Sequence, residues 1–230
     1  MDGVVLHGVA PPLRWSDFSV AAFDMDSTLI TIECVDEIAD FAGRKAEVAA
    51  ITEAAMRGEI ADYKESLRRR VALLSGLGLE ALQRVLDERL RLTDGAERLL
   101  GACKAHGLQT LLVSGGFTFF AERVAERLAI DEVRANVLEV ADGRLTGRLV
   151  DQLWGDIVDG AMKKQALLET CERLGVPASR AIAVGDGAND LPMLGVAGLS
   201  VAFHAKPAVR ERAMVSIERG GLDRLLAVFR

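Results

Sequence analysis

Two aspartates lie one residue apart at the end of an apolar run near the N-terminus. The run Val-Ala-Ala-Phe at 20–23 is followed by Asp24, Met25 and Asp26. A short apolar run that ends in polar residues predicts a buried parallel strand. Chemistry in open α/β sheets lies just beyond the carboxyl ends of the strands. Two carboxylates at that place repel each other unless a cation or a proton lies between them.

A carboxylate pair of this kind suits phosphoryl transfer. One carboxylate can attack phosphorus and form an aspartyl-phosphate. The other can protonate the leaving oxygen and then deprotonate water. Because Asp24 and Asp26 are two positions apart, a strand would point both side chains to the same side. An ordinary acidic turn at the end of a strand remains the alternative, since the pair alone is a weak motif.

A second stretch could bind an anion. Residues 108–113 predict another buried strand, and Ser114, Gly115 and Gly116 follow it. Small side chains let backbone N–H groups approach a phosphate, and the N-terminus of a following helix favours negative charge. Thr118 is the expected cap of that helix. The alternative is a flexible turn with no ligand.

A lysine and an acid-rich loop complete the candidate set. Lys163 or Lys164, at the start of a helix expected over 161–174, could neutralise a phosphate. Counting back from Gly175, a C-cap residue, favours Lys163 and leaves Lys164 open. The run Gly-Asp-Gly-Ala-Asn-Asp at 185–190 follows an expected strand at 181–184. Its carboxylates suit Mg²⁺, although a turn and a helix cap would use the same residues.

These residues need elements that position them. Strands alternate with helices after about residue 93, with another strand expected at 199–203, which predicts an α/β fold with a parallel sheet and right-handed crossovers. Residues 33–92 show helical spacing and no strand pattern, so they predict a helical insert after the first strand. We expect a hairpin within 137–150, turning at Asp142 and Gly143. The residues at 94–97 have capping-box spacing before a helix that reaches about His106.

Composition narrows the function classes. The 230 residues carry a net charge of −6, which argues against a nucleic-acid or anionic-membrane surface. The three cysteines have no metal-ligand spacing and imply no disulfide framework. No stretch is long and apolar enough to span a bilayer, and residues 1–15 predict a short extension and not a signal peptide. A cytoplasmic location is therefore expected.

Taken in order, these motifs resemble the haloacid dehalogenase superfamily of phosphohydrolases and, in detail, its phosphoserine phosphatase family. The resemblance is carried by Phe-Asp-Met-Asp-Ser-Thr-Leu at 23–29, Ser-Gly-Gly-Phe at 114–117, the run at 185–190 and Ala-Lys-Pro at 205–207. It implies a Rossmann-like parallel sheet core, formed by 1–32 and 93–230. A small helical cap, 33–92, would be inserted after the first strand.

The resemblance also implies a role for each motif residue. Asp24 would be the nucleophile and Asp26 the general acid and base. Mg²⁺ would be held by Asp24, the Asp26 carbonyl and Asp186, with Asp190 supporting it from behind. The remaining substrate contacts would come from the phosphate-binding residues Ser114, Gly115, Lys163 and Asn189, and from the cap residues Glu33, Met56, Tyr63 and Arg70.

Within the cap, the resemblance implies that Glu33 binds an ammonium group, that Arg70 binds a carboxylate, and that Met56 and Tyr63 form an apolar wall. Arg70 has independent support, because it lies on the same helical face as two leucines, and a guanidinium there needs an anionic partner. The alternative is that Arg70 pairs with an acid of the protein itself.

The function implied is Mg²⁺-dependent hydrolysis of O-phospho-L-serine to L-serine and phosphate through an aspartyl-phosphate, the final step of L-serine biosynthesis. The enzyme would act as a monomer or homodimer, with no nucleic-acid or membrane partner. The alternatives are a phosphoserine:homoserine phosphotransferase, another small-metabolite phosphatase of the superfamily, and a non-enzymatic phospho-acceptor switch. A purely structural or binding module ranks last, because it leaves the acid cluster without a purpose.

Overall fold

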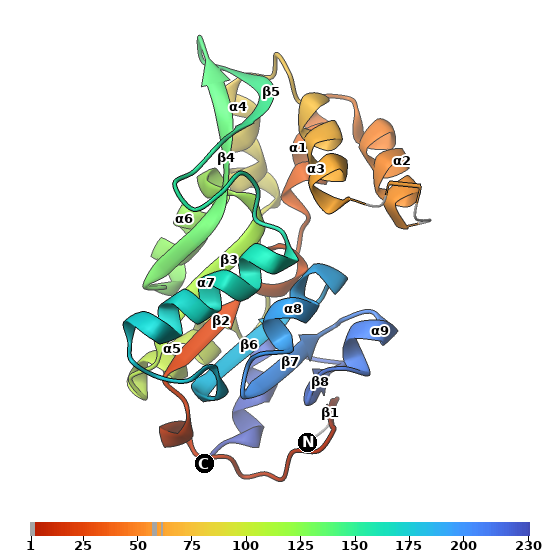
Figure 1. The fold of residues 1–230 in the computed structure, drawn as a ribbon. Helices are drawn as coiled ribbons and strands as arrows, with labels where there is room; N and C mark the ends of the chain where they lie inside the picture. The colour runs from red at the N-terminus through yellow and green to blue at the C-terminus, as the bar shows by residue number, and fades with distance from the viewer. Residues whose placement is uncertain (1–2, 57–58, 61) are drawn as a thin grey trace.

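The computed structural model describes residues 3–56, 59–60 and 62–230 and shows an eight-stranded, mostly parallel sheet with helices on both faces (Figure 1). The strand order is β1-β8-β7-β6-β2-β3-β4-β5. The strands are β1 Val4–Leu6, β2 Val20–Phe23, β3 Gln109–Phe117, β4 Glu132–Ala141, β5 Arg144–Val150, β6 Ala181–Gly185, β7 Leu199–Phe203 and β8 Val215–Ile217. The predicted α/β fold is confirmed.

The helices fall into two groups. Those between β2 and β3 are α1 Cys34–Phe41, α2 Lys45–Met56, α3 Tyr63–Ala72 and α4 Leu79–Arg84, which continues as a π-helical turn, Val85–Arg89. Those of the sheet are α5 Ala96–Ala105, α6 Thr118–Leu128, α7 Gly160–Arg173, α8 Leu191–Leu194 and α9 Pro207–Arg210. We call the first group the helical segment; Figure 1 shows it above the sheet.

The central strand β2 is buried along its whole length and pairs in parallel with β3 and β6. In this register Phe23 lies beside Leu112 on one side and Val184 on the other. The three strands therefore reach the same edge of the sheet together. The residues that follow Phe23, Val113 and Gly185 meet at that edge because their strands run in the same direction.

Alternate side chains of the central strands enter two different cores. Ala21 and Phe23 belong to the core that also contains residues of α5, α6 and the helical segment. Val20 and Ala22 belong to the core under α7 and α8. This alternation follows from the period of two along a strand. Because the first core continues into the helical segment, that segment packs on the sheet domain through shared apolar residues.

The hairpin supports the helical segment in a way that the sequence does not reveal. Its turn is the predicted one, with Asp142 and Gly143 both in the left-handed region (φ 49° and 72°). The Leu145 N–H donates to the carbonyl of Leu77 at 2.8 Å, and the Leu145 carbonyl accepts from the N–H of Gly76, also at 2.8 Å. The hairpin thus joins the end of the sheet to the loop between α3 and α4.

Four local expectations are wrong. The N-terminal segment is not a mere extension, because β1 pairs with β8 antiparallel. The strand β3 continues through the Ser-Gly-Gly turn to Phe117, with a shifted register against β4. Thr118 starts α6 without capping it. The capping box at 94–97 does not form, because Gly95 is the N-cap, in a left-handed conformation, with no side-chain bond.

Two further features of the fold concern the cysteines and the lengths of the helices. Cys34, Cys103 and Cys171 are buried and unbridged, as expected. None of the helices in the described ranges has the length and apolar character that crossing a membrane requires.

Asn136 is a buried polar residue that ties the sheet edge together, and its loss should destabilise the fold. Its side chain donates to the Gly115 carbonyl at 2.8 Å and accepts from the Val158 N–H at 2.9 Å. Asn136→Ala leaves both groups unpaired, so the free energy of unfolding should fall by about 2–4 kcal/mol. Urea unfolding measures this. The exposed control Gln83→Ala should change it by less than about 0.5 kcal/mol; equal effects would contradict the assignment.

Candidate active site

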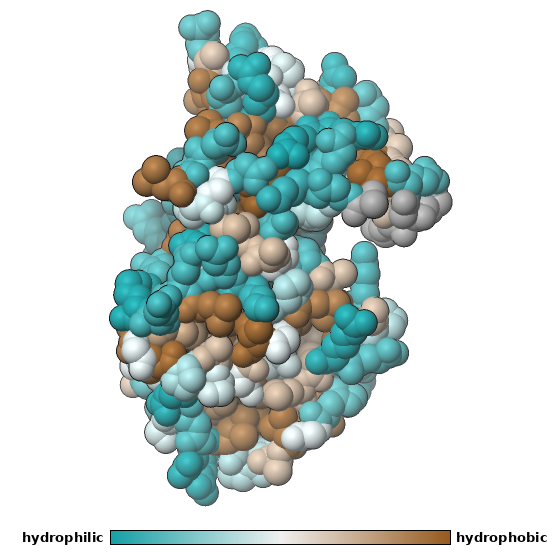
Figure 2. Space-filling model, in the orientation of Figure 1, coloured by the Kyte–Doolittle hydropathy of each residue, from teal (hydrophilic) through white to brown (hydrophobic). Residues whose placement is uncertain are grey.

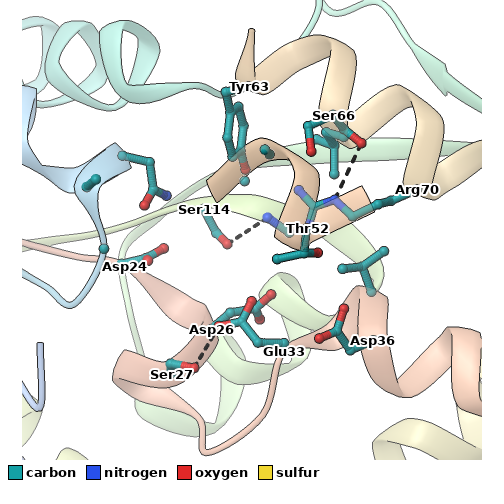
Figure 3. Close-up of a pocket in the computed structure, with 18 of the residues that line it drawn as sticks. Asp24, Asp26, Ser27, Glu33, Asp36, Thr52, Tyr63, Ser66, Arg70 and Ser114 are labelled. Carbon is teal, nitrogen blue, oxygen red and sulfur yellow. Dashed lines mark hydrogen bonds between the residues drawn. The ribbon is translucent and has the colours of Figure 1, made fainter. Parts of the chain in front are cut away.

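A cavity of about 610 Å³ lies between the helical segment and the edge of the sheet where β2, β3 and β6 end. Figure 2 shows the molecule hollowed below α2 and α3. The sheet side is lined by Asp24, Asp26, Ser114, Gly115, Asp186 and Asn189, and the helical segment contributes Glu33, Asp36, Thr52, Tyr63, Ser66 and Arg70. The structure therefore brings together nearly all the residues singled out from the sequence (Figure 3).

Asp24 and Lys163 form a buried ion pair at the floor of this region. The Lys163 Nζ lies 2.7 Å from Asp24 Oδ1 and 2.7 Å from Asp190 Oδ1, and its side chain is fully buried. The Met25 N–H also donates to Asp24 Oδ1, at 2.8 Å. Lys164 is exposed. The geometry therefore selects Lys163 of the two lysines for contact with Asp24.

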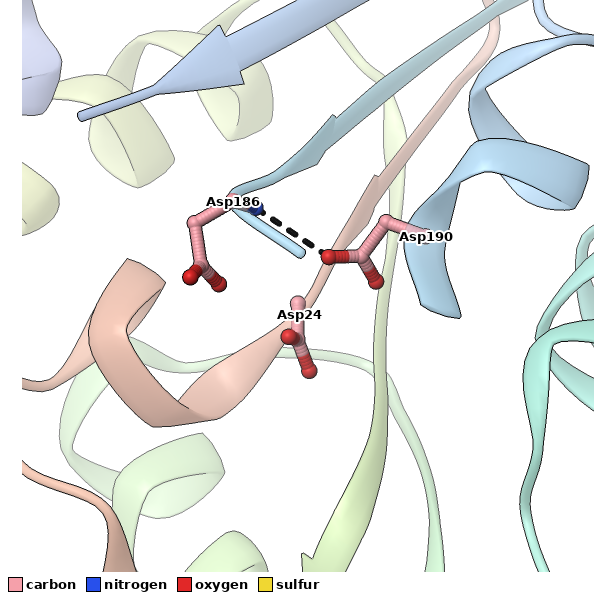
Figure 4. Close-up of side chains that lie close together, drawn as sticks. All are labelled: Asp24, Asp186 and Asp190. Carbon is pink, nitrogen blue, oxygen red and sulfur yellow. Dashed lines mark hydrogen bonds between the residues drawn. The ribbon is translucent and has the colours of Figure 1, made fainter. Parts of the chain in front are cut away.

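Three carboxylates converge at the same point. Oxygens of Asp24, Asp186 and Asp190 lie within 4.8 Å of one another (Figure 4). Asp190 Oδ2 accepts hydrogen bonds from the backbone N–H groups of Asp186 (3.1 Å) and Gly187 (3.0 Å). Both oxygens of Asp190 are thus used within the protein. Asp190 orients the loop and Lys163, whereas Asp24 and Asp186 keep oxygens directed at the common point.

Gly185 makes room for this arrangement. A Cβ on Gly185 would lie 2.4 Å from the carboxylate carbon of Asp190. Thr28 completes the contact between the two loops, because its hydroxyl donates to Asp186 Oδ1 at 3.3 Å. The turn after β2 and the loop after β6 are therefore held together by polar contacts among their own residues.

The carboxylates are held against strong electrostatic cost. Burial, and then the charge of Asp190, raise the pKa of Asp24 well above its ordinary value, while Lys163 opposes the shift. Burial and the charge of Asp190 likewise raise the pKa of Asp186 to about 7. Burial alone would lower the pKa of Lys163, but the charges of Asp190 and Asp24 raise it above the usual range. One lysine does not balance three carboxylates, so the site favours further positive charge.

The donor set fits a hard divalent cation. All the candidate ligand atoms are carboxylate oxygens, which hard cations prefer, and they converge within one ion's reach. A bound cation would relieve the repulsion that raises the pKa values of Asp24 and Asp186. The residues present are therefore suited to a metal ion.

Asp26 lies beside this cluster in a different environment. Its Oδ2 accepts from the Cys34 N–H at 3.2 Å, where α1 begins. Its Oδ1 is the one buried side-chain oxygen or nitrogen among the described residues that has no hydrogen-bond partner. Burial, and then the charge of Glu33, raise its pKa to about 7. A carboxyl group with such a pKa can give and take a proton near neutrality.

The Ser-Gly-Gly turn faces the acids from the end of β3. The Ser114 hydroxyl oxygen accepts from the Gly116 N–H at 2.9 Å. A Cβ on Gly115 would lie 2.0 Å from the Tyr63 hydroxyl, and one on Gly116 would lie 3.2 Å from Asp26 Oδ2. Gly115 is therefore needed where the Tyr63 hydroxyl lies, whereas a Cβ on Gly116 would meet the end of the Met25 side chain at 2.9 Å and require only a small shift.

The helical segment and the residue before it supply charge of both signs to the cavity. Arg70 is half-buried, and its Nε donates weakly to the Ser66 carbonyl at 3.4 Å. Within the ranges that the structure describes, no ion pair joins Arg70 to a carboxylate. Burial raises the pKa of Asp36, and the charge of Arg70 offsets only part of that rise. Figure 3 shows Glu33 and Asp36 on the side of the cavity facing Arg70. The space between these facing charges suits a ligand that carries both an ammonium and a carboxylate.

Two of the cap residues need separate comment. Tyr63 contributes more than an apolar surface, because its hydroxyl lies against Gly115, and burial raises its pKa to about 12. The side chain of Met56 lies outside the described residues.

Sequence reasoning missed two polar residues that line the cavity, Ser27 and Asp36. The Ser27 hydroxyl donates to Glu33 Oε1 at 2.7 Å, and Ser27 has a left-handed backbone (φ 56°) that is uncommon outside glycine. Asp36 lies one helical turn after Glu33, so helical spacing could have placed it on the same face. No sequence pattern marks the Ser27 conformation.

The two adjacent lysines allow a matched test of the buried ion pair. Lys163→Gln removes the cation between Asp24 and Asp190, so the free energy of unfolding should fall by about 3 kcal/mol or more. Lys164→Gln, on the exposed side of the same helix, should change it by less than about 0.5 kcal/mol. Urea unfolding with a chelator present compares them. Similar small changes in both variants would show that the buried pair contributes little.

Comparison with known proteins agrees with this geometry. The family model of haloacid dehalogenase-like hydrolases matches residues 21–195. A phosphoserine phosphatase from Albidiferax ferrireducens is 67% identical over 227 residues, which are 99% of this chain and 96% of that protein. One from Idiomarina loihiensis is 49% identical over 204 residues, 89% of this chain and 90% of that protein.

Solved structures show the same fold. A phosphoserine phosphatase described as a phospho-aspartyl intermediate analogue has a TM-score of 0.84 and 38% identity, covering 93% of this chain and 99% of that one. A substrate-bound phosphoserine phosphatase complex has a TM-score of 0.84 and 37% identity over the same shares. The chain therefore belongs to the haloacid dehalogenase-like hydrolases and, among them, to the phosphoserine phosphatase family.

Proposed function

We propose that this protein hydrolyses O-phospho-L-serine to L-serine and phosphate, the reaction that would complete L-serine biosynthesis. One observation carries the proposal: a single cavity holds the Asp24 and Asp26 carboxyl groups, with Glu33 beside Asp26 and Arg70 facing them from α3. The two aspartates suit a phosphoryl group, and the facing charges of Arg70 and Glu33 suit the carboxylate and the ammonium of an amino acid. The phosphatases that match this chain over nearly its full length support the same reaction.

In the first step, Asp24 attacks phosphorus. Its Oδ1 accepts hydrogen bonds from Lys163 and the Met25 N–H, so we assign the attack to Oδ2. A bond forms between that oxygen and phosphorus while the bond from phosphorus to the serine oxygen breaks. Asp26 gives its proton to the departing oxygen, so that L-serine leaves as the alcohol. Its pKa of about 7 in the free protein suits this role.

In the second step, the aspartyl-phosphate is hydrolysed. Asp26, now a carboxylate, takes a proton from water as the water oxygen bonds to phosphorus. The bond between phosphorus and Asp24 breaks, phosphate leaves, and Asp26 is again protonated. Ser114, the Gly115 N–H, Lys163 and Asn189 are the groups proposed to hold the phosphoryl oxygens during both steps.

We assign Mg²⁺ to the acid cluster, held by the carboxylates of Asp24 and Asp186 and the carbonyl of Asp26. When bound, it would neutralise these acids and the negative charge of the phosphoryl oxygens. Asp190 would support the site through the loop N–H groups and Lys163 that it already contacts. The ligands are all oxygen atoms, which supports a hard cation such as Mg²⁺.

We propose that residues 33–92 act as a cap over a core formed by 1–32 and 93–230. Closing the cap would exclude bulk water during transfer, and opening it would release the products. In the cap, Arg70 would bind the substrate carboxylate and Glu33 its ammonium, with Ser27 orienting Glu33 through the 2.7 Å hydrogen bond. Met56 and Tyr63 stay predictions as apolar contacts to the substrate.

Removing the metal or the nucleophile should abolish turnover. Phosphate release from O-phospho-L-serine should require Mg²⁺, stop with a chelator, and return when Mg²⁺ is added in excess. Asp24→Asn should lower kcat by on the order of 10³-fold or more, because an amide cannot form the intermediate. Stoichiometric phosphorylation of Asp24 without turnover would instead indicate a phospho-acceptor switch. Phosphohomoserine formed on adding homoserine would indicate a phosphotransferase.

Substitution at Arg70 should separate recognition of the amino acid from phosphoryl transfer. Arg70→Ala should raise KM for O-phospho-L-serine by about 10- to 100-fold, because a charge-assisted, bidentate contact is lost. Activity toward a phosphomonoester without a carboxylate should change little. The neighbouring Arg69→Ala is the control, since Arg69 pairs with Glu65 on its own helix at 2.7 Å. Equal KM values in Arg70→Ala and wild type would contradict the cap assignment.

A further inference from the structure

A cluster of ion pairs joins helix α3 to the segment between β5 and α7. The Lys64 Nζ lies 2.8 Å from Asp156 Oδ1 and 3.7 Å from Asp159 Oδ2. An Arg68 terminal nitrogen lies 2.5 Å from Asp156 Oδ2. Both oxygens of Asp156 are therefore engaged by cations of the helical segment. We call residues 156–159 the Asp156 segment.

Asp156 removes a penalty that α3 would otherwise carry. Lys64 and Arg68 are four residues apart on the helix, so their like charges lie side by side and repel. The carboxylate of Asp156 lies between them. Hydrogen bonding to Lys64 lowers the pKa of Asp156, and the same bond raises the pKa of Lys64. The repulsion between Lys64 and Arg68 is thus offset where α3 lies against Asp156.

The other face of α3 belongs to the active site. Tyr63 and Arg70 line the cavity, whereas Lys64 and Arg68 point to the Asp156 segment. The contact that anchors α3 is therefore separate from the residues that would touch substrate. A shift of α3 away from Asp156 would carry Arg70 and Tyr63 with it.

The Asp156 segment is itself connected by hydrogen bonds to the sheet side of the cavity. Ile157 and Val158 are buried, and the Val158 N–H donates to Asn136, which in turn donates to the Gly115 carbonyl. Asp159 caps α7 by accepting from the Met162 N–H at 2.9 Å. Lys163, the next residue of that first turn, contacts Asp24. Six residues separate Asp156 from Lys163 along the chain, and α7, which carries Lys163, lies along the sheet (Figure 1).

We propose that Asp156 is a positioning residue for the reaction, which pairs with Lys64 and Arg68 to hold α3 so that Arg70 stays in the cavity that Asp24 and Glu33 also line. The inference rests on the proposed function, in which Arg70 binds the substrate carboxylate. Its role is to raise the fraction of molecules whose cap is placed for binding. When fewer molecules have the cap placed for binding, the apparent KM rises, while the chemistry at phosphorus is unaltered.

The test compares Asp156→Asn, Lys64→Gln and Arg68→Gln with Arg69→Gln, whose parent side chain is the next one along α3 and pairs within the helix. The first three variants should raise KM for O-phospho-L-serine by about 3- to 10-fold, as expected for a partly exposed ion-pair network, with kcat retained within twofold. Arg69→Gln should match wild type. KM for methyl phosphate, which has no groups for Arg70 or Glu33, should change by less than twofold in every variant.

Two further measurements distinguish positioning from general damage. Asp156→Glu keeps the carboxylate, so its KM for O-phospho-L-serine should be close to that of wild type and well below that of Asp156→Asn. Combining Lys64→Gln with Asp156→Asn should raise KM by less than the product of the two single effects. An Asp156→Asn variant with wild-type KM would overturn the proposal, as would equal loss of kcat with both esters.

Hydrogen exchange separates failure of this proposal from failure of the proposed function. In the free protein, amide exchange of α3 should be about 3- to 10-fold faster in Asp156→Asn than in wild type or Arg69→Gln. If wild type does not hydrolyse O-phospho-L-serine but this difference is present, the proposed function fails and the anchoring role of Asp156 stands. Unchanged exchange in α3 would overturn the anchoring role.

Discussion

The structure depends on a buried imbalance of charge at the end of the central strand. Asp24, Asp186 and Asp190 converge around one lysine, and burial makes their repulsion costly. Lys163 forms ion pairs with Asp24 and Asp190. The backbone N–H groups of the loop donate hydrogen bonds to the other oxygen of Asp190. Positive charge is still lacking in this cluster, and this lack suits the site to a cation that would in turn attract a phosphoryl group. A fold can maintain such a cluster only if rigid elements hold every member in place.

The parallel sheet supplies that rigidity. Phe23 lies in register with Leu112 and Val184, so three polar turns emerge side by side without any long-range adjustment of loops. Glycines then make room at two of these turns: Gly185 admits the Asp190 carboxylate of its own loop, and Gly115 admits the Tyr63 hydroxyl of α3. The core under α7 and α8 fixes Lys163 from the other side, because its helix packs on the same strands. Chemistry and packing share these residues.

The helical segment is coupled to the core more closely than a simple lid requires. Apolar contacts continue from the sheet into it, the hairpin β4–β5 hydrogen-bonds to the loop after α3, and Asp156 pairs with two of its cations. The Cys34 N–H at the start of α1 donates to Asp26. The proposed binding of the amino-acid part of a substrate by the helical segment would therefore be linked to the proposed chemistry at phosphorus through several short contacts.

The sequence by itself determined the order of elements and the chemical types at the strand ends. Apolar runs of strand length, the Asp142–Gly143 turn and the motif resemblance were sufficient for the α/β fold and the family. They could not distinguish Lys163 from Lys164 with certainty, since adjacent helix residues differ only in which face packs inward. They also missed the pairing of β1 with β8, Ser27 beside Glu33, and Asp156 between Lys64 and Arg68. Each of these depends on contacts between residues far apart in the chain or on an unusual backbone angle, and only the tertiary structure decides those.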